Sequence, residues 1–105
     1  MPKGILYVES RPSSPEEAAE YHKWYENVHI PEVLAVEGFV SARRFALTDD
    51  GPFIAIYEIE ADDLEAVQAR LLEASKTGAM SPPVATQSDP PPIFRFLRQI
   101  AEYAP

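Results

Sequence analysis

The sequence predicts an α+β fold of the ferredoxin-like type, with elements in the order β-α-β-β-α-β. Four apolar runs have the composition of strands, and two segments combine a helix-start signal with apolar residues at helical spacing. A short turn joins the second and third runs, which makes them an antiparallel hairpin. Together these observations predict a four-stranded antiparallel sheet with two helices covering one face.

The first run, Gly4-Ile5-Leu6-Tyr7-Val8, predicts a strand in the middle of the sheet. Successive side chains of a strand point to opposite faces, and both faces of this run are apolar. We therefore expect this strand to be covered on both sides.

A helix should follow, because Ser14 is a candidate N-cap, Pro15 suits the first helical position and Glu17 completes a capping box. Pro31 disfavours helix at the residue before it, so this helix should end near His29, with a short turn through residues 32–34 and a stop at Gly38. Its buried stripe should consist of Ala18, Tyr21, Tyr25 and Val28, with Trp24 beside it.

Residues 39–48 and 53–60 predict the second and third strands, joined by the turn Asp49-Asp50-Gly51-Pro52. One face of the third strand should carry Phe53, Ala55, Tyr57 and Ile59.

The second helix begins with a capping signature formed by Asp62 and Glu65, and Gly78 is placed to end it. Its apolar stripe should consist of Leu64, Val67, Leu71 and Leu72.

Residues 78–92 contain five prolines among small polar residues, which excludes regular structure. A loop this long in a small domain either serves a function, such as covering a ligand or contacting a partner, or is simply mobile. The fourth strand should follow at residues 93–97. Residues 98–103 then continue it through a bulge or cross to a partner subunit.

The composition describes one domain, 1–105, with a modest core that dimerisation would enlarge. The net charge of −8 argues against nucleic acid and anionic membrane surfaces as partners. The chain has no cysteine, and its start lacks the apolar stretch of a secretory signal, so we expect a cytoplasmic protein. It has no run long enough to span a membrane.

Both histidines and the only tryptophan lie within residues 21–32. His22, Tyr25 and His29 have the spacing i, i+3 and i+7, which places them along one side of a helix. Two imidazoles and a phenol around a pocket would suit general acid–base catalysis on a carbonyl compound. The alternatives are that His22 is a solvated helix residue and that His29 interacts with the negative end of the helix dipole.

Four further residues are candidates for ligand binding: Trp24, Arg43, Arg44 and Tyr57. Trp24 could line an aromatic pocket or pack in the core. Arg43 and Arg44 are adjacent on a strand and must face opposite ways, so one of them could bind an oxyanion or pair with an acidic residue.

No metal site is expected, because two histidines seven residues apart do not form a zinc-binding pair and no third ligand is evident beyond Glu26 or Glu32. The sequence has no glycine-rich phosphate loop and no nucleotide fingerprint, so we expect no cofactor.

Residues 24–34, Val36-Glu37-Gly38-Phe39 and Arg43-Arg44-Phe45 together resemble the EthD-like branch of the dimeric α+β barrel superfamily. Members of that branch typically carry four motifs in this order: Trp-Tyr, a His-Ile-Pro-type turn, a Pro-Gly-Phe-type entry into the second strand, and an Arg-Tyr-like pair. This chain departs from the pattern with a glutamate before the glycine and with Phe45 in place of tyrosine. The resemblance is close over residues 21–45.

The resemblance implies a homodimer whose two sheets form a barrel, with a ligand cleft between each sheet and its own helices. It points to His29 as the functional residue, with Trp24 beside it. The leading hypothesis is an enzyme acting on a small apolar carbonyl or phenolic compound as a cyclase, dehydratase, isomerase or cofactor-free monooxygenase. The alternatives are a non-catalytic ligand-binding or accessory protein and, third, a haem or metal protein.

Overall fold

The computed structural model describes residues 2–105. Its strands are β1 Lys3–Ser10, β2 Phe39–Ala46, β3 Phe53–Glu60 and β4 Ile93–Arg98. Its helical segments are a 3₁₀ turn at Pro15–Glu17, α1 Ala18–Trp24, a π-helical turn at Tyr25–His29, α2 Ile30–Leu34 and α3 Leu64–Thr77.

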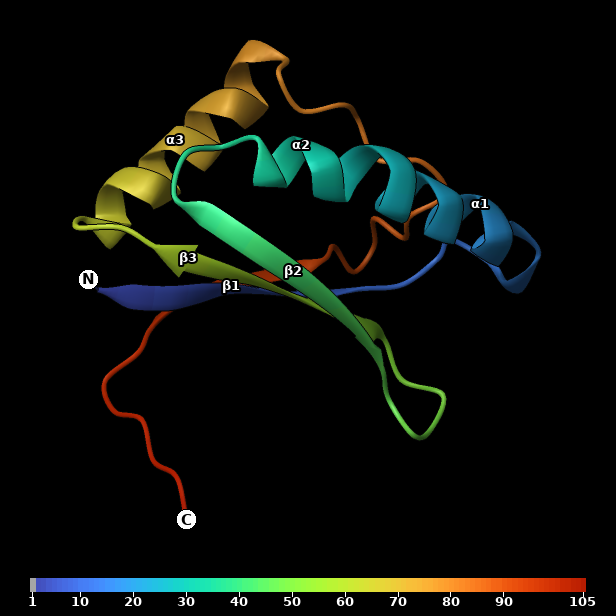
Figure 1. Ribbon diagram of the computed structural model, residues 1–105. Helices are drawn as coiled ribbons and strands as arrows, with labels where there is room; N and C mark the ends of the chain where they lie inside the picture. Colours follow the sequence, from blue (N-terminus) through green and yellow to red (C-terminus); the bar gives the residue numbers. More distant parts are fainter. Residues whose placement is uncertain (1) are drawn as a thin grey trace.

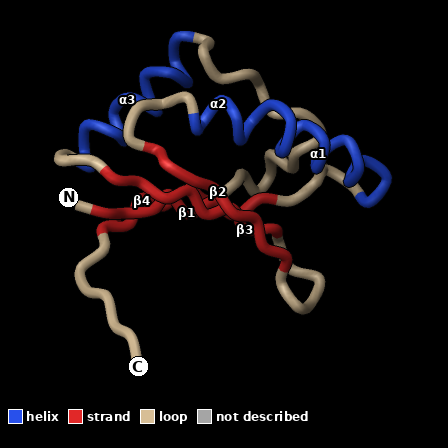
Figure 2. Tube along the Cα trace, viewed as in Figure 1, coloured by secondary structure: helices blue, strands red, loops and turns tan. Residues whose placement is uncertain are grey.

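The four strands form one antiparallel sheet in the order β2-β3-β1-β4. All the helices lie on one side of this sheet, and the other side is open (Figures 1 and 2). The predicted ferredoxin-like arrangement and the β2–β3 hairpin are therefore confirmed.

Strand β1 occupies a central position, as predicted, but only one of its faces is covered. Leu6 and Val8 lie beneath the helices and are 1% and 2% exposed. Ile5 and Tyr7 are half-buried on the open face. The expectation of two covered faces was wrong for the single chain, because both helical layers pack on the same side.

The first helical segment begins at Pro15, as predicted, but without the capping box. Ser14 has the extended backbone of an N-cap, yet its side chain makes no capping hydrogen bond. Only the Ser14 carbonyl is used, by accepting a hydrogen bond from the backbone N–H of Glu17 at 3.1 Å.

The predicted helix end near His29 is wrong. The chain stays helical through Ile30, whose backbone is right-handed α at φ −59° and ψ −48°, and continues to Leu34. Proline has no N–H to donate and clashes with a regular α-helical turn before it. A π-helical turn at Tyr25–His29 ends two residues before Pro31, so the regular α-helical ladder is already interrupted in the turn that leads to the proline.

Helix α3 ends as predicted and begins one residue later than predicted. Gly78 adopts the left-handed conformation at φ +83° and closes the helix. The N-cap is Asp63, not Asp62, and its carboxylate accepts a hydrogen bond from the N–H of Ala66 at 3.2 Å. Leu72 is 52% exposed and lies outside the buried stripe of Leu64, Val67 and Leu71.

Residues 78–92 form no helix or strand, as predicted, but their middle is paired with the segment that follows β1. The Ser13 N–H donates to the carbonyl of Ala85, and the Gln87 N–H donates to the carbonyl of Arg11, each at 2.8 Å. This long connection is therefore held across one end of the molecule.

Strand β4 pairs with β1 and ends at Arg98. The Gln99 N–H still donates to the carbonyl of Lys3 at 2.9 Å, but residues 99–105 form no strand, and the chain leaves on the side away from the helices (Figure 1). Ile100 and Tyr103 are 93% and 92% exposed there. No helix within residues 2–105 is long and apolar enough to cross a membrane.

Candidate active site between the helices and the sheet

The π-helical turn brings Trp24 and His29 together. Their rings stack with centroids 4.8 Å apart and planes 22° from parallel. In an α-helix, residues five apart point to different sides, whereas a π turn hydrogen-bonds residues five apart and makes them neighbours. The same widening moves His29 away from the line through His22 and Tyr25 that the sequence spacing predicts.

His29 does not occupy a helix C-terminus, because the helical backbone runs on through α2. The dipole interaction considered from the sequence therefore does not account for this histidine. Tyr25 contacts the imidazole edge-on at 5.0 Å, so the ring lies between two aromatic side chains of the same segment.

A cavity of about 270 Å³ opens beside this pair. Its walls come from β1, α1, the π-helical turn, α2, α3, β4 and the proline-rich connection. They are mostly apolar; the lining residues are Leu6, Trp24, His29, Val33, Leu71, Ser75, Met80, Ser81, Pro82, Pro83 and Phe94. The cavity is concave, apolar and supplied with a few polar atoms, as small-molecule sites are.

Four buried side-chain polar atoms have no hydrogen-bond partner in the described chain: Trp24 Nε1, His29 Nδ1, Arg44 Nε and Tyr57 Oη. Buried polar groups are nearly always hydrogen-bonded, so each exception calls for an explanation. All four belong to residues that the sequence singled out, and two of them, from Trp24 and His29, belong to cavity-lining side chains.

Burial controls the protonation of His29. Removal of the imidazolium from water lowers the pKa of His29 to about 4, and the nearby Glu32 carboxylate opposes this only in part. At neutral pH the imidazole is therefore uncharged, with a lone pair available on one nitrogen.

Tyr57 and Tyr25 lie behind the cavity in the helix–sheet core. Tyr57 is fully buried, and its ring centroid is 6.4 Å from that of His29. Burial raises the pKa of both phenols, so both stay protonated at neutral pH.

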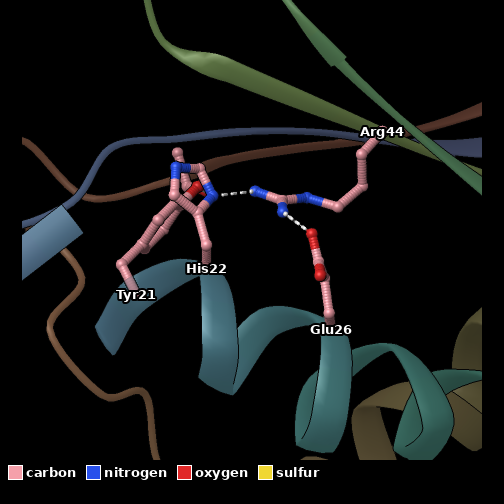
Figure 3. A network of polar contacts seen from close by, with 5 residues as sticks. Tyr21, His22, Glu26 and Arg44 are labelled. Carbon is pink, nitrogen blue, oxygen red and sulfur yellow. Dashed lines mark hydrogen bonds and ion pairs between the residues drawn. The ribbon is translucent and has the colours of Figure 1, made fainter. Parts of the chain in front are cut away.

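Arg44, His22 and Glu26 form a separate polar cluster (Figure 3). The Arg44 guanidinium donates to His22 Nδ1 at 3.2 Å and to the Glu26 carboxylate at 3.1 Å. It also lies 4.5 Å from the centroid of the Tyr25 ring. Because arginine only donates, His22 Nδ1 must accept. Burial, followed by the charge of Arg44, lowers the pKa of His22.

Arg43 faces the open side of the sheet and forms an exposed ion pair with Glu58 at 3.1 Å. A β-bulge between Phe39 and Ser41 decides this orientation. Regular alternation from the buried Phe39 would turn Arg43 toward the helices, and the extra residue turns Arg44 there instead. The structure thus does not bring Arg43 to His29.

The candidate residues therefore separate into two groups. Trp24 and His29 line the cavity, with Tyr25 and Tyr57 behind them, while His22 and Arg44 belong to the polar cluster. Sequence reasoning considered Glu32 only as a metal ligand and missed Ser81, because the contact between them joins segments 49 residues apart. Within residues 2–105 no group of three or more His, Cys, Asp or Glu side chains could hold a metal.

No protein-family model matches the sequence, and no curated protein gives a match. Solved structures do resemble it. The ActVA-Orf6 monooxygenase of Streptomyces coelicolor, solved in complex with nanaomycin D, gives a TM-score of 0.61 at 18% identity over 97% of this chain and 92% of that one. An ethyl tert-butyl ether D (EthD) family protein from Bacillus halodurans gives 0.61 at 14% identity over 95% and 100%.

This chain has the ferredoxin-like α+β fold of these two proteins. The resemblance read from residues 21–45 is thereby confirmed for the fold. A protein of unknown function from Nitrosomonas europaea shares it as well, with a TM-score of 0.55 at 16% identity over 100% of this chain and 96% of that one. Identities this low establish the fold and leave the chemistry to the site itself.

Proposed function

We propose that this protein binds a small apolar carbonyl or phenolic compound in the cavity beside His29 and transforms it by general acid–base chemistry. The observation that carries the proposal is the pair of unpartnered buried nitrogens, Trp24 Nε1 and His29 Nδ1, on side chains that line an apolar cavity. A ligand oxygen among apolar ligand atoms would satisfy both the walls and the nitrogens.

The size of the cavity favours a small, flat ligand. Its volume of about 270 Å³ lies just below the range of roughly 300–1,000 Å³ that is typical of ligand sites. The walls contributed by Leu6, Val33, Leu71 and Phe94 are apolar, so a compound of one or two fused rings bearing one or two oxygens would fit best.

His29 is proposed to act as the base. Cyclisation, dehydration, isomerisation and cofactor-free monooxygenation of such compounds share a first step, the removal of a proton from a C–H or O–H group conjugated to a carbonyl or aromatic ring. An uncharged imidazole can accept that proton, and Trp24 Nε1 can donate to the oxygen on which negative charge develops. In a monooxygenation, the resulting anion would supply the electrons to dioxygen: one oxygen atom would bond to a ring carbon, the other would leave as water, and the phenol would be oxidised to a quinone.

The related folds support a small-molecule role. The ActVA-Orf6 protein is a monooxygenase solved with nanaomycin D. Among the four reactions, this favours a cofactor-free monooxygenase for the present chain. We propose that Arg44 supports the site indirectly by holding Tyr25 through its cation–π contact.

The second candidate is a non-catalytic ligand-binding or accessory protein. The pKa of His29, about 4, favours it, because so weakly basic a group is a poor proton acceptor at neutral pH unless the ligand's own proton is acidic.

Hydrogen–deuterium exchange can separate the two candidates without knowledge of the natural substrate. The probe is 2-tetralone, a bicyclic ketone with acidic α-hydrogens, followed by NMR in D₂O. We expect the protein to catalyse the exchange, and His29→Gln to reduce the catalysed rate by roughly 100-fold or more. Asn27→Ala, an exposed position on the same turn, should leave it unchanged.

Binding is followed through the fluorescence of Trp24, the only tryptophan. Saturable binding of 2-tetralone without exchange above the buffer rate would favour the non-catalytic candidate. An unchanged rate in a folded His29→Gln protein would eliminate His29 as the base. Oxygen uptake with 1-naphthol tests the monooxygenase reaction separately.

A further inference from the structure

One wall of the cavity is formed by four consecutive residues of the long connection, Met80, Ser81, Pro82 and Pro83. The opposite wall is the π-helical turn and α2, which carry His29 and Glu32. The connection therefore passes directly over the side chains to which we assign binding and proton transfer.

Glu32 holds this wall through both of its carboxylate oxygens. The Ser81 backbone N–H donates to one oxygen at 2.8 Å, and the Ser81 hydroxyl donates to the other at 2.7 Å. These two hydrogen bonds lower the pKa of Glu32, which keeps it ionised and able to accept both.

No other hydrogen bond in the described chain joins residues 81–84 to another element. The segment before them is fixed by the end of α3, where the N–H groups of Ala79 and Met80 donate to the carbonyl of Ala74 at 3.0 and 3.3 Å. The segment after them is fixed at Ala85 by the contact with Ser13. By hydrogen bonds the wall is thus attached at its two ends and, between them, only at Glu32, while Met80 also packs against the core.

The geometry of the chain allows this wall to move as a unit. Pro82 and Pro83 have fixed φ angles, so a displacement of Ser81 carries both rings with it.

We propose that Glu32 and Ser81 form a latch, and that release of this latch lets residues 81–83 swing away from His29 and admit a ligand. The existence of the latch depends only on the contacts described above. Its role in admitting a ligand rests on the proposed function. The two hydrogen bonds from Ser81 to Glu32 hold the wall closed. Neither of them involves a nitrogen of Trp24 or His29, so Trp24 Nε1 and His29 Nδ1 stay available to a ligand.

Acrylamide quenching of Trp24 fluorescence measures the opening directly, because the only tryptophan lies under this wall and is 9% exposed. Ser81→Ala removes one of the two hydrogen bonds, and Glu32→Ala removes both. We expect the quenching constant to rise in that order, with a two- to several-fold increase for Glu32→Ala. Ser88→Ala, an exposed serine of the same connection, and Glu20→Gln, an exposed carboxylate of α1, are the matched controls.

Quenching that is the same in Ser81→Ala, Glu32→Ala and wild type would overturn the latch. Circular dichroism establishes that each variant is folded, and Ser81→Ala, the milder change, decides the question if Glu32→Ala is not folded.

Stopped-flow binding of 1,4-naphthoquinone, detected by Trp24 quenching, tests ligand admission. If the latch controls access, both the association and the dissociation rate constants should rise by roughly tenfold in Ser81→Ala, while their ratio changes little. Unchanged rate constants together with increased acrylamide quenching would mean that ligands use another opening, which overturns the admission role. Absence of quinone binding in all proteins would contradict the proposed ligand class, and acrylamide quenching would still decide the latch.

Discussion

On folding, the His29 imidazole loses contact with water and stacks on the face of the Trp24 indole. The cost appears in its pKa, which burial lowers from 6.5 to about 4. This cost makes His29 a poor choice for packing alone, because a leucine or phenylalanine would fill the same space without a polar atom to satisfy. Selection for an ionisable or hydrogen-bonding group explains the residue better.

The depressed pKa predicts a particular dependence of stability on pH. Between pH 6.5 and pH 4 the unfolded chain binds a proton at this histidine and the folded chain does not, so the free energy of unfolding must fall as the pH falls through that window. Above about pH 6.5 His29 is uncharged in both the folded and the unfolded chain, so this loss of stability is absent. The loss attributable to His29 should amount to roughly 2–3 kcal/mol at pH 4.

Urea denaturation of wild type and His29→Gln across this range isolates the contribution, since the other titrating groups, His22 included, are common to both. As the pH falls toward 4, the wild type should lose stability relative to His29→Gln. Any advantage in unfolding free energy that the wild type has at neutral pH should therefore shrink or reverse. Parallel stability curves would contradict the assignment.

Sequence reasoning located His29 and Trp24 but could not choose between Arg43 and Arg44. Alternation along a strand says only that neighbours face opposite ways. The choice was made by one extra residue after Phe39, and nothing in the local sequence marks that bulge.

At the scale of elements, the π-helical turn at Tyr25–His29 is the feature that sequence periodicity predicts least well. A pattern read at 3.6 residues per turn assigns His29 to the face of His22 and Tyr25. The real turn is wider, so His29 stacks on Trp24 while it keeps an edge contact with Tyr25. The rule that a proline ends a helix failed at the same place for the same reason. Such turns are frequent at functional sites, which fits the position of this one.

The start of α3 offers a clean test of capping, because two aspartates stand side by side. Asp63 accepts the N–H of Ala66, and Asp62 makes no such bond. Asp63→Ala should lower the free energy of unfolding by about 1 kcal/mol, whereas Asp62→Ala should change it by less than about 0.5 kcal/mol. Thermal denaturation of the two variants measures both, and equal losses would show that the cap has been misassigned.

For the molecule as a whole, the sequence was a good guide to the layers and their order. Strand-like runs, a two-strand hairpin and two apolar helical stripes are enough to specify a sheet covered by helices. The sequence could not place residues 80–83 over the cavity, because their position depends on contacts with α2 and with residues 11–13, which are far away along the chain.

The uncovered face of the sheet is where we expect a second copy of the chain. Large apolar side chains are exposed there: Phe45, Ile93 and Leu97 at 43%, 42% and 45%. Half-buried Ile56, opposite Tyr7, lies near the middle of that face. Patches of this kind usually mark interfaces.

Light scattering after size exclusion should therefore give twice the chain mass of 11.7 kDa for the wild type. Ile56→Glu should give a monomer at micromolar concentration, because a carboxylate in the centre of an apolar interface would be desolvated without a partner. Leu72→Glu, an exposed leucine on α3 on the other side of the sheet, should remain dimeric. A monomeric wild type would refute the expected assembly.

The pairing of β4 with β1 has a consequence for how the cavity comes into being. Gly4 lies opposite Arg98, and Glu9 opposite Ile93, so β1 can pair with β4 only after the last strand has been synthesised. Phe94 of β4 and the nearby residues 80–83 complete the cavity around Leu6. Closing so long a loop is entropically expensive and slow, and synthesis delivers about 5–20 residues per second. A ribosome-bound chain that has reached only α3 therefore carries His29 and Trp24 without an enclosed cavity, and it acquires the cavity only in the last stage of folding.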